Sequence, residues 1–342
     1  MNSSRILPKI CVAGCGHWGK NLIRNFHNLG CLHGVSDSDA VRLQNFSAQY
    51  GVKAYGNFEQ VLLDPDVDAV VLATPAEQHA PMTIAALNAG KDVFVEKPLA
   101  LKVQDGLEMV AVARRQNRLL MVGHLLLYHP AILKIKELLD SGELGKLEYI
   151  YSNRLSMGKI RREENALWSF APHDISVIVM LTGELPVQVS ALGGAYVQPN
   201  IADVTVSNLL FNHGTRAHIF VSWLHPYKEQ RLVVIGANKM VVFDDSRATD
   251  KLVVYDKQIG FENGNFQVTQ PKACPVPLPD IEPLFAECQH FIECVRDRGT
   301  PRTPGGDGVI VLQVLQACQR SLQMNGEPVQ VSALAERQVA AL

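Results

Sequence analysis

The chain has 342 residues, enough for two domains with substantial cores. Hydrophobic residues make up 47% and charged residues 19%, a globular composition that excludes a disordered chain. The net charge of -2, from 32 basic and 34 acidic side chains, indicates neither a nucleic-acid nor a membrane partner. No apolar segment is long enough for a signal peptide or a membrane span, so we expect a soluble cytoplasmic protein.

The first 124 residues alternate short apolar runs with helical patterns. Strands are predicted at 10–13, 31–36, 69–73, 92–95 and 119–122, and helices at 18–28, 40–50, 79–89 and 102–116. Gly51 and Gly90 follow two of these helices, where glycine commonly ends a helix. Continuous apolar strands between helices predict an α/β Rossmann domain with a doubly wound parallel sheet.

The pattern changes after residue 124. Helices are predicted at 130–139, 173–181, 283–298 and 305–323, and strands at 147–155, 187–196, 204–212, 215–224, 232–235 and 240–243. Asn212-His213-Gly214 predicts a tight turn between two of these strands, and 261–279 is predicted to be a loop. We therefore predict domains at 1–124 and 125–342, the second being α+β with a large, mostly antiparallel open sheet.

The seven cysteines, at 11, 15, 31, 274, 288, 294 and 318, form no CxxC pair. Several lie in apolar runs, as expected of reduced, buried thiols. No group of cysteine and histidine has the spacing of zinc ligands, so no metal site is predicted.

A GxGxxG motif, Gly14-Cys15-Gly16-His17-Trp18-Gly19, lies between the first predicted strand and helix. Gly14 allows the tight turn, Gly16 lets the backbone approach a pyrophosphate, and Gly19 allows close packing of helix on strand. The phosphates then lie at the helix N-terminus, beside His17 and Trp18. The motif predicts a dinucleotide site.

Asp37 follows the second predicted strand, about twenty residues after the glycines. A carboxylate there accepts hydrogen bonds from the ribose hydroxyls and repels a 2′-phosphate, which favours NAD over NADP. The alternative is a helix cap ahead of Asp39. We expect Arg42 to lie too far into the next helix to bind a 2′-phosphate.

Polar residues also follow the next two strands of the predicted sheet. Thr74, Pro75 and His79 either line the nicotinamide ribose or form a helix cap with an exposed histidine. Glu96-Lys97-Pro98 follows an apolar run, and ligands bind outside the carboxyl ends of parallel strands. Lys97 therefore faces a binding crevice, unless it is a solvated loop lysine.

In combination these motifs resemble those of the Gfo/Idh/MocA family of sugar and cyclitol oxidoreductases. The motifs are Gly14–Gly19, Ala73-Thr74-Pro75 with His79, Glu96-Lys97-Pro98, Val122-Gly123-His124, His173-Asp174 opening a helix, and Thr303-Pro304-Gly305-Gly306-Asp307-Gly308. The resemblance implies a Rossmann domain with Glu96 and Lys97 at the cofactor, and a cis peptide bond at Lys97-Pro98. It also implies a second domain whose open sheet mediates a homodimer or homotetramer.

The resemblance assigns proton transfer to Lys97 and His173. NAD accepts the hydride. The imidazole of His173, which titrates near neutrality, is the base for the hydroxyl proton. Lys97 orients that hydroxyl and stabilises the developing negative charge. Asp174 either orients His173 or serves the helix N-terminus, and His173 itself is otherwise a helix residue bonded to a neighbour.

Ser169 departs from the family pattern, because many members have an aspartate four residues before the catalytic histidine. This departure disfavours the inositol and simple glucose enzymes. Leu167-Trp168-Ser169 and Ser222-Trp223-Leu224-His225-Pro226 instead resemble the nucleotide-sugar branch. That branch oxidises the 3-hydroxyl of UDP-N-acetylglucosamine and passes the 3-keto sugar to an aminotransferase, in lipid A or surface-polysaccharide synthesis.

A UDP-sugar adds a diphosphate and a base to be bound. Residues of suitable chemistry for the substrate are Arg154, Lys159, Arg161, Ser169, Asp174, Trp223 and Lys228. Arginine suits bidentate phosphate contacts, although charge runs are usually solvated faces. Trp223 either stacks on uracil or belongs to the core.

Other functions remain open from the sequence. A second enzymatic hypothesis has UDP-N-acetylglucosaminuronate, a free sugar or a cyclitol as the substrate. A hypothesis of another class is a catalytically silent NAD-binding sensor or repressor. The presence of both Lys97 and His173 argues against the silent protein, which needs neither.

Overall fold

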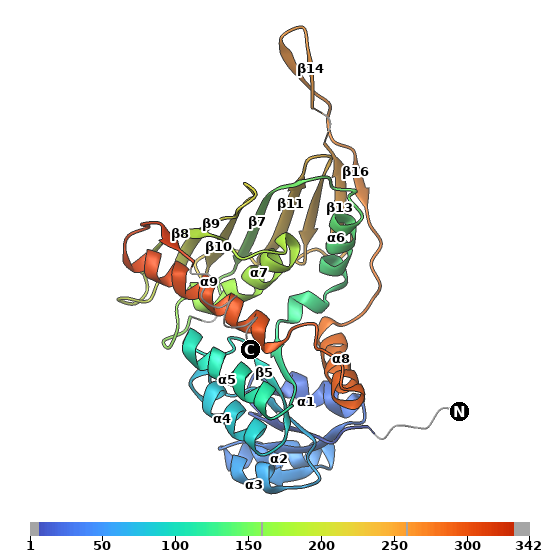
Figure 1. Ribbon diagram of the computed structural model, residues 1–342, viewed down its shortest axis with the longest axis vertical. Coiled ribbons are helices and arrows are strands. Elements are labelled where there is room, and N and C mark those ends of the chain that lie inside the picture. Colours follow the sequence, from blue (N-terminus) through green and yellow to red (C-terminus); the bar gives the residue numbers. More distant parts are fainter. Residues whose placement is uncertain (1–6, 159, 258, 332–342) are drawn as a thin grey trace, which may run out of the picture. The chain divides into compact units, whose positions relative to one another are not determined.

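The computed structural model describes residues 7–158, 160–257 and 259–331, which form two compact units (Figure 1). Of the described residues, the first unit contains 7–128 together with Ile281–Leu312, and the second contains those of His129–Asp280 and 313–331. The boundary predicted after residue 124 did not anticipate that 281–312 returns to the first unit.

The first unit is built on a six-stranded sheet of order β3-β2-β1-β4-β5-β6, in which every pair is parallel. The strands are β1 (Ile10–Ala13), β2 (Leu32–Ser36), β3 (Lys53–Tyr55), β4 (Ala69–Leu72), β5 (Asp92–Glu96) and β6 (Leu120–Gly123). The predicted parallel sheet is confirmed. Strand β3 was missed because two of its three residues are exposed, so it carries no apolar run.

Helices pack against this sheet, and among them α1 contacts α8 and α4 contacts α5. They are α1 (Gly19–Asn28), α2 (Ala40–Tyr50), α3 (Phe58–Leu63), α4 (Ala76–Asn88), α5 (Val103–Arg115) and α8 (Pro283–Asp297), with a short 3-10 helix, η1 (Leu125–Tyr128). Phe291 of α8 contacts Phe26 and Phe94, with ring centroids 6.3 and 5.6 Å apart. Burying such a ring contributes about 1.5–3 kcal/mol, which holds α8 on the Rossmann unit.

The second unit is built on a nine-stranded sheet of order β16-β13-β12-β11-β7-β10-β9-β8-β17. Its strands are β7 (Leu147–Leu155), β8 (Gln188–Gly194), β9 (Val204–Leu210), β10 (Arg216–Ser222), β11 (Glu229–Gly236), β12 (Lys239–Asp244), β13 (Leu252–Asp256), β16 (Ala273–Pro275) and β17 (Val329–Gln330). Only β7 and β10 pair in parallel, so the prediction of a mostly antiparallel sheet is confirmed. Helices α6 (Pro130–Asp140) and α7 (Ala166–Thr182) pack on it, and α9 (Gly305–Gln323) crosses the boundary at residue 312.

The loop predicted at 261–279 is wrong. The segment contains most of a hairpin, β14 (Ile259–Glu262) with β15 (Asn265–Val268), which extends away from the nine-stranded sheet (Figure 1). Asn263 and Gly264 have φ of 52° and 81°, as two-residue hairpin turns require. The Asn-Gly pair was therefore a usable signal, but every residue of both strands is exposed, so no alternation of burial accompanies it.

The prediction that a helix opens at His173-Asp174 is also wrong. Helix α7 begins at Ala166, where the Asn165 side chain caps it by accepting from the Trp168 N–H at 3.1 Å. Pro172 lies inside the helix, and proline usually marks a first turn, so the sequence pattern placed the start too late.

Within the described ranges, we find no helix with the length and apolar character needed to cross a bilayer.

Candidate active site

The glycine-rich turn after β1 is packed tightly at two of its three glycines. Gly14 has φ of +94°, and a Cβ there would lie 2.5 Å from the Ala73 carbonyl oxygen. A Cβ on Gly19 would lie 1.8 Å from the carbonyl oxygen of Gly14. At Gly16 no protein atom lies within 4 Å of the added Cβ. The protein thus needs Gly14 and Gly19 for its own packing, whereas Gly16 leaves open space where a pyrophosphate approaches the backbone.

Asp37, at the end of β2, holds this turn. Its Oδ2 accepts from the Cys15 N–H at 2.7 Å and its Oδ1 from the Asp39 N–H at 2.8 Å. The helix cap is a different residue, Asp39, which accepts from the N–H groups of Val41 and Arg42 at 3.0 Å. The cap alternative for Asp37 is therefore wrong.

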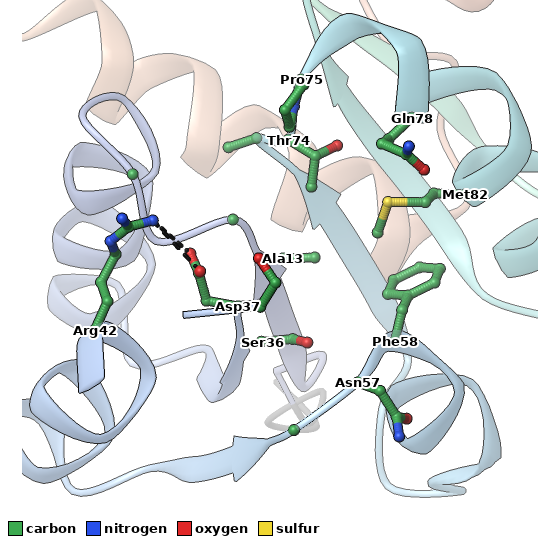
Figure 2. Close-up of a pocket in the computed structure, with 15 residues that line it drawn as sticks. Ala13, Ser36, Asp37, Arg42, Asn57, Phe58, Thr74, Pro75, Gln78 and Met82 are labelled. Carbon is green, nitrogen blue, oxygen red and sulfur yellow. Dashed lines mark hydrogen bonds and ion pairs between the residues drawn. The ribbon is translucent and has the colours of Figure 1, made fainter. Parts of the chain in front are cut away.

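Arg42 reaches farther than the sequence analysis expected. Its Nη1 lies 3.3 Å from Asp37 Oδ2, and Figure 2 shows the guanidinium turned toward that carboxylate. Both side chains line the same pocket, so the expectation that Arg42 is too far along its helix is corrected.

The pocket has a volume of about 730 Å³ and lies at the carboxyl ends of β1, β2 and β4 (Figure 2). Its lining includes Ala13, Gly14, Gly16, Ser36, Asp37, Ser38, Arg42, Gly56, Asn57, Phe58, Ala73, Thr74, Pro75, Gln78 and Met82. Phe58 and Met82 supply apolar surface suited to an adenine, and Asp37 supplies an acceptor suited to its ribose. The residues present therefore fit a dinucleotide.

Sequence reasoning missed the part of the lining that lies beyond the glycine motif. Asn57 and Phe58 begin the short helix α3, whose existence the apolar pattern did not show. Gln78 and Met82 lie one turn apart on α4 and have no motif of their own. These four residues line the pocket only because the parallel sheet places α3 and α4 at the same edge of the sheet.

Of the residues predicted after β4, Thr74 and Pro75 line the pocket but His79 does not. His79 is buried, with its Nδ1 2.7 Å from the Pro98 carbonyl oxygen and its Nε2 2.9 Å from that of Thr74. Burial lowers the pKa of His79, against the effect of these two carbonyls. The histidine therefore ties the turn after β4 to the turn after β5, and the exposed-histidine alternative is wrong.

Glu96 ends β5 as a buried carboxyl group. Its Oε1 accepts the indole N–H of Trp18 at 2.5 Å, and its Oε2 accepts from the Lys97 backbone N–H at 3.3 Å. A Cβ on Gly123 would lie 3.0 Å from the carboxyl group, so β6 leaves room for it only through a glycine. Burial raises the pKa of Glu96 to about 7, although the Trp18 bond and the Lys97 charge both lower it. Glu96 thus links the glycine-rich turn to Lys97.

Lys97 is half-buried, and its peptide bond to Pro98 is cis, as the family resemblance implied. Burial and the Lys97 charge lower the pKa of His124 to about 4, so that imidazole is neutral. Within the glycine-rich turn, directly before α1, His17 is exposed and Trp18 is partly exposed. These residues lie at the carboxyl ends of β1, β5 and β6.

In the second unit, His173 lies in the middle of α7 and is half-buried. Ser169 lies one turn earlier and is buried, so the four-residue spacing of the family pattern persists on one helical face. Asp174 forms a bidentate ion pair with Arg154, at 3.0 and 3.1 Å, and accepts from Ser152 Oγ at 2.6 Å. Asp174 therefore fastens α7 to β7, and its predicted alternative at a helix N-terminus is wrong.

The structure corrects two substrate predictions. The Arg154 guanidinium is committed to Asp174 and is only 13% exposed, so it is not available to a phosphate. Trp223 is fully buried and cannot stack on a base, so the core alternative is confirmed. Arg161 pairs with Glu164 at 3.1 Å, and Lys228 is exposed. Lys159 lies outside the described residues.

One group of potential metal ligands occurs in the described part of the chain. His33, Asp64 and Asp66 offer atoms within 4.8 Å of one another. Asp64 already accepts from Lys53 Nζ at 2.9 Å and from the Tyr55 hydroxyl at 2.8 Å. Because Asp64 is already bound by a lysine and a tyrosine, we assign no metal to this cluster.

The fold and the pocket of the first unit define an NAD-binding oxidoreductase. Residues 8–124 match the family described as oxidoreductases with an NAD-binding Rossmann fold, and residues 132–242 match the Gfo/Idh/MocA C-terminal domain. The chain belongs to the Gfo/Idh/MocA family, and its cofactor is NAD.

Known relatives cover nearly the whole chain. It is 27% identical over 307 residues to UDP-N-acetylglucosamine 3-dehydrogenase of Acidithiobacillus ferrooxidans, covering 90% of this chain and 93% of the relative. It is also 27% identical to scyllo-inositol 2-dehydrogenase (NAD(+)) of Bacillus subtilis, covering 94% and 96%. A solved structure of the Acidithiobacillus ferrooxidans enzyme aligns with a TM-score of 0.84 at 25% identity, covering 94% of this chain and 99% of that one.

Proposed function

We propose that the chain oxidises the 3-hydroxyl of a UDP-N-acetylhexosamine, UDP-N-acetylglucosamine in the first instance, to the 3-keto sugar. The observation that carries this proposal is the similarity to UDP-N-acetylglucosamine 3-dehydrogenase, which extends over 93% of that enzyme and reaches a TM-score of 0.84. Ser169, buried one turn before His173 where inositol enzymes have an aspartate, supports the nucleotide-sugar branch over the inositol branch.

NAD, when bound, supplies the hydride acceptor. The Gly14–Gly19 turn and the N-terminus of α1 would hold its pyrophosphate, and Asp37 would hold its adenosine ribose. Phe58 and Met82 line the same pocket and would supply apolar surface to the adenine. These groups would orient the cofactor in the pocket.

Lys97 and His173 carry the proton chemistry in this proposal. His173 accepts the hydroxyl proton, because imidazole is the side-chain group best suited to act as a general base near neutral pH. The Lys97 ammonium hydrogen-bonds the same oxygen and stabilises negative charge as the carbonyl forms. Oxidation of the alcohol thus yields the ketone, NADH and one proton.

The remaining substrate candidates have different support. Lys228 is exposed beside exposed Tyr227, so its ammonium group is accessible to a diphosphate. Arg161 has a surface partner in Glu164, which weakens its case. We further propose that the keto product passes to an aminotransferase in lipid A or surface-polysaccharide synthesis, and that the chain acts as a homodimer or homotetramer.

The test is NADH formation with a panel of alcohols at matched concentration. UDP-N-acetylglucosamine, UDP-N-acetylgalactosamine and UDP-N-acetylglucosaminuronate are compared with N-acetylglucosamine, glucose and scyllo-inositol. We expect turnover with UDP-N-acetylglucosamine and identification of the product as a 3-keto sugar by borodeuteride reduction and NMR. Turnover of a free sugar or cyclitol without turnover of any nucleotide sugar contradicts the proposal.

Variants test the proposed roles separately from cofactor binding. Lys97→Met and His173→Asn should lower kcat by about 100-fold or more while NAD+ binding, measured by calorimetry, stays within about threefold of the parent. Lys272→Met and His213→Asn change exposed residues of the same types and serve as matched controls. Full activity in either active-site variant removes that residue from the mechanism.

The alternative with specific support is a cyclitol dehydrogenase. The scyllo-inositol enzyme of Bacillus subtilis is as similar in identity as the UDP-sugar enzyme and covers slightly more of this chain. The same panel decides between them, since scyllo-inositol is one of its members.

A further inference from the structure

Helix α8 carries a carboxyl group in a place that packing alone would give to an apolar residue. Glu287 is fully buried, on the same helical face as Leu284, Cys288 and Phe291. Among the described residues, neither oxygen of Glu287 has a hydrogen-bond partner. A buried polar group without a partner is costly, so this acid requires an explanation.

The packing of α8 places Glu287 toward the end of β5 that carries Glu96. Phe291 contacts Phe94 at 5.6 Å. Glu287 lies one turn before Phe291 on the same helical face, and Glu96 lies two residues after Phe94 on the same side of its strand. Next to the Phe291–Phe94 contact, the packing of α8 on β5 therefore brings Glu287 toward Glu96. Burial raises the pKa of Glu287 well above its usual range, and the nearby Glu96 charge raises it further.

The contacts of the two carboxyl groups decide which one holds a proton. Glu96 accepts hydrogen bonds from the Trp18 indole and from the Lys97 backbone, and the positive charge of Lys97 stabilises its anionic form. Glu287 has none of these contacts. Two carboxylates in one buried layer cannot both ionise. Glu96 is therefore the anion and Glu287 the acid.

The neighbouring ionisable groups on α8 and η1 leave this assignment unchanged. Burial raises the pKa of Tyr128 on η1 and of Cys288 on α8, so both are neutral. Arg24 of α1 pairs with Glu282 before α8.

Two further groups lie toward β6 and η1. Arg302 stacks over the Tyr128 ring at 4.8 Å and donates to the Leu127 carbonyl at 3.3 Å. His124, after β6, is neutral, because burial and the Lys97 charge lower its pKa. Lys97 is thus the cation that acts on Glu96.

We propose that Glu287 is a positioning residue, a buried carboxylic acid that hydrogen-bonds Glu96 through one bridging water and keeps Glu96 anionic. The Glu96 carboxylate then holds the Trp18 indole beside the pyrophosphate turn and holds the Lys97 backbone at the strand end. NAD binding depends on this arrangement, whichever alcohol is oxidised. An apolar residue of the same size packs as well but donates nothing to Glu96.

The test compares Glu287→Gln, which keeps a donor, with Glu287→Met, which keeps only the volume. The readout is the Trp18 indole resonance of protein labelled with 15N-tryptophan, assigned with Trp18→Phe and followed against pH. We expect the same midpoint in the parent and Glu287→Gln, and a midpoint about one to two pH units higher in Glu287→Met, because a bond to the anion is lost. NAD+ affinity should fall about tenfold in Glu287→Met and by less than about twofold in Glu287→Gln.

Thermal unfolding separates this role from packing. Glu287→Met should unfold at a higher temperature than the parent while binding NAD+ more weakly, because it removes a desolvated acid. Equal midpoints and equal NAD+ affinities in the two variants overturn the proposal. If Glu287→Met does not fold, Glu287→Leu replaces it: a Trp18 midpoint higher than that of Glu287→Gln together with weaker NAD+ binding supports the pair, and equal midpoints refute it.

Discussion

Replacing Asp37 with alanine should shift the enzyme from NAD toward NADP. The carboxylate is 6% exposed and makes its charged contacts inside the cofactor pocket. Removing it deletes a charge-assisted bond to the ribose and leaves the Cys15 N–H without its acceptor at 2.7 Å. Such bonds contribute about 1.5–3 kcal/mol, so NAD+ affinity should fall about 10- to 100-fold.

The same change should favour NADP. Arg42, now 3.3 Å from the carboxylate, would be released next to the position of a 2′-phosphate. Its guanidinium is 44% exposed, so solvent limits the gain to about 1 kcal/mol, or roughly fivefold. The ratio of the two dissociation constants should therefore change by about 50-fold or more.

Calorimetric titration with NAD+ and NADP+ measures this ratio without a substrate. Asp39→Asn is the matched control, because Asp39 caps α2 and contacts Arg42 at 3.2 Å but does not line the pocket. We expect an unchanged ratio in that variant, and loss of the NADP gain in Asp37→Ala/Arg42→Ala. A ratio within about threefold of the parent in Asp37→Ala refutes the role of Asp37 at the ribose.

Three further predictions use other contacts. Gly16→Ala should fold normally, because the added Cβ meets no protein atom, but it should bind NAD+ at least about tenfold more weakly in calorimetry, because the Cβ lies where the pyrophosphate approaches. Gly14→Ala should instead lower the melting temperature. Normal NAD+ binding by Gly16→Ala would contradict this assignment. Arg154→Ala should destabilise the protein by about 3–5 kcal/mol in urea unfolding, since it leaves the Asp174 charge buried and unpaired, and an unchanged midpoint would show that the pair is dispensable. The pKa of His124 is about 4 in the folded protein and 6.5 in the unfolded chain, so the unfolded chain binds the proton first and the protein loses stability as the pH falls from 6.5 toward 4. His124→Gln should remove about 3 kcal/mol of this loss, measured by urea unfolding at several pH values. An identical pH dependence in the variant would disprove the prediction.

The local chemistry of the cofactor site could be predicted from the sequence. The glycine spacing specifies one turn between a strand and a helix, because Gly14 and Gly19 have no room for a side chain. Asp37 follows from the length of one strand–helix–strand unit. Apolar periodicity likewise predicted the parallel sheet, which the structure confirms. These features depend on residues that are near in sequence.

Elements without an apolar pattern escaped prediction. The strand β3 and the hairpin β14–β15 are mostly exposed, so burial does not shape their sequence. The start of α7 was misplaced because Pro172 lies inside the helix, where packing outweighs the usual effect of proline.

The sequence by itself determined the Rossmann unit, the cofactor class and the residues around the glycine turn, because each is encoded within a short stretch. Only the tertiary structure brought Phe58 and Met82 to the pocket, Arg154 to Asp174, and the returning helix α8 to β5. The physical reason is that these contacts join segments far apart in the chain, whose register is decided by packing and not by local spacing. Glu287, an unremarkable helix residue in the sequence, acquires its role only when Phe291 packs on Phe94 and sets it toward Glu96.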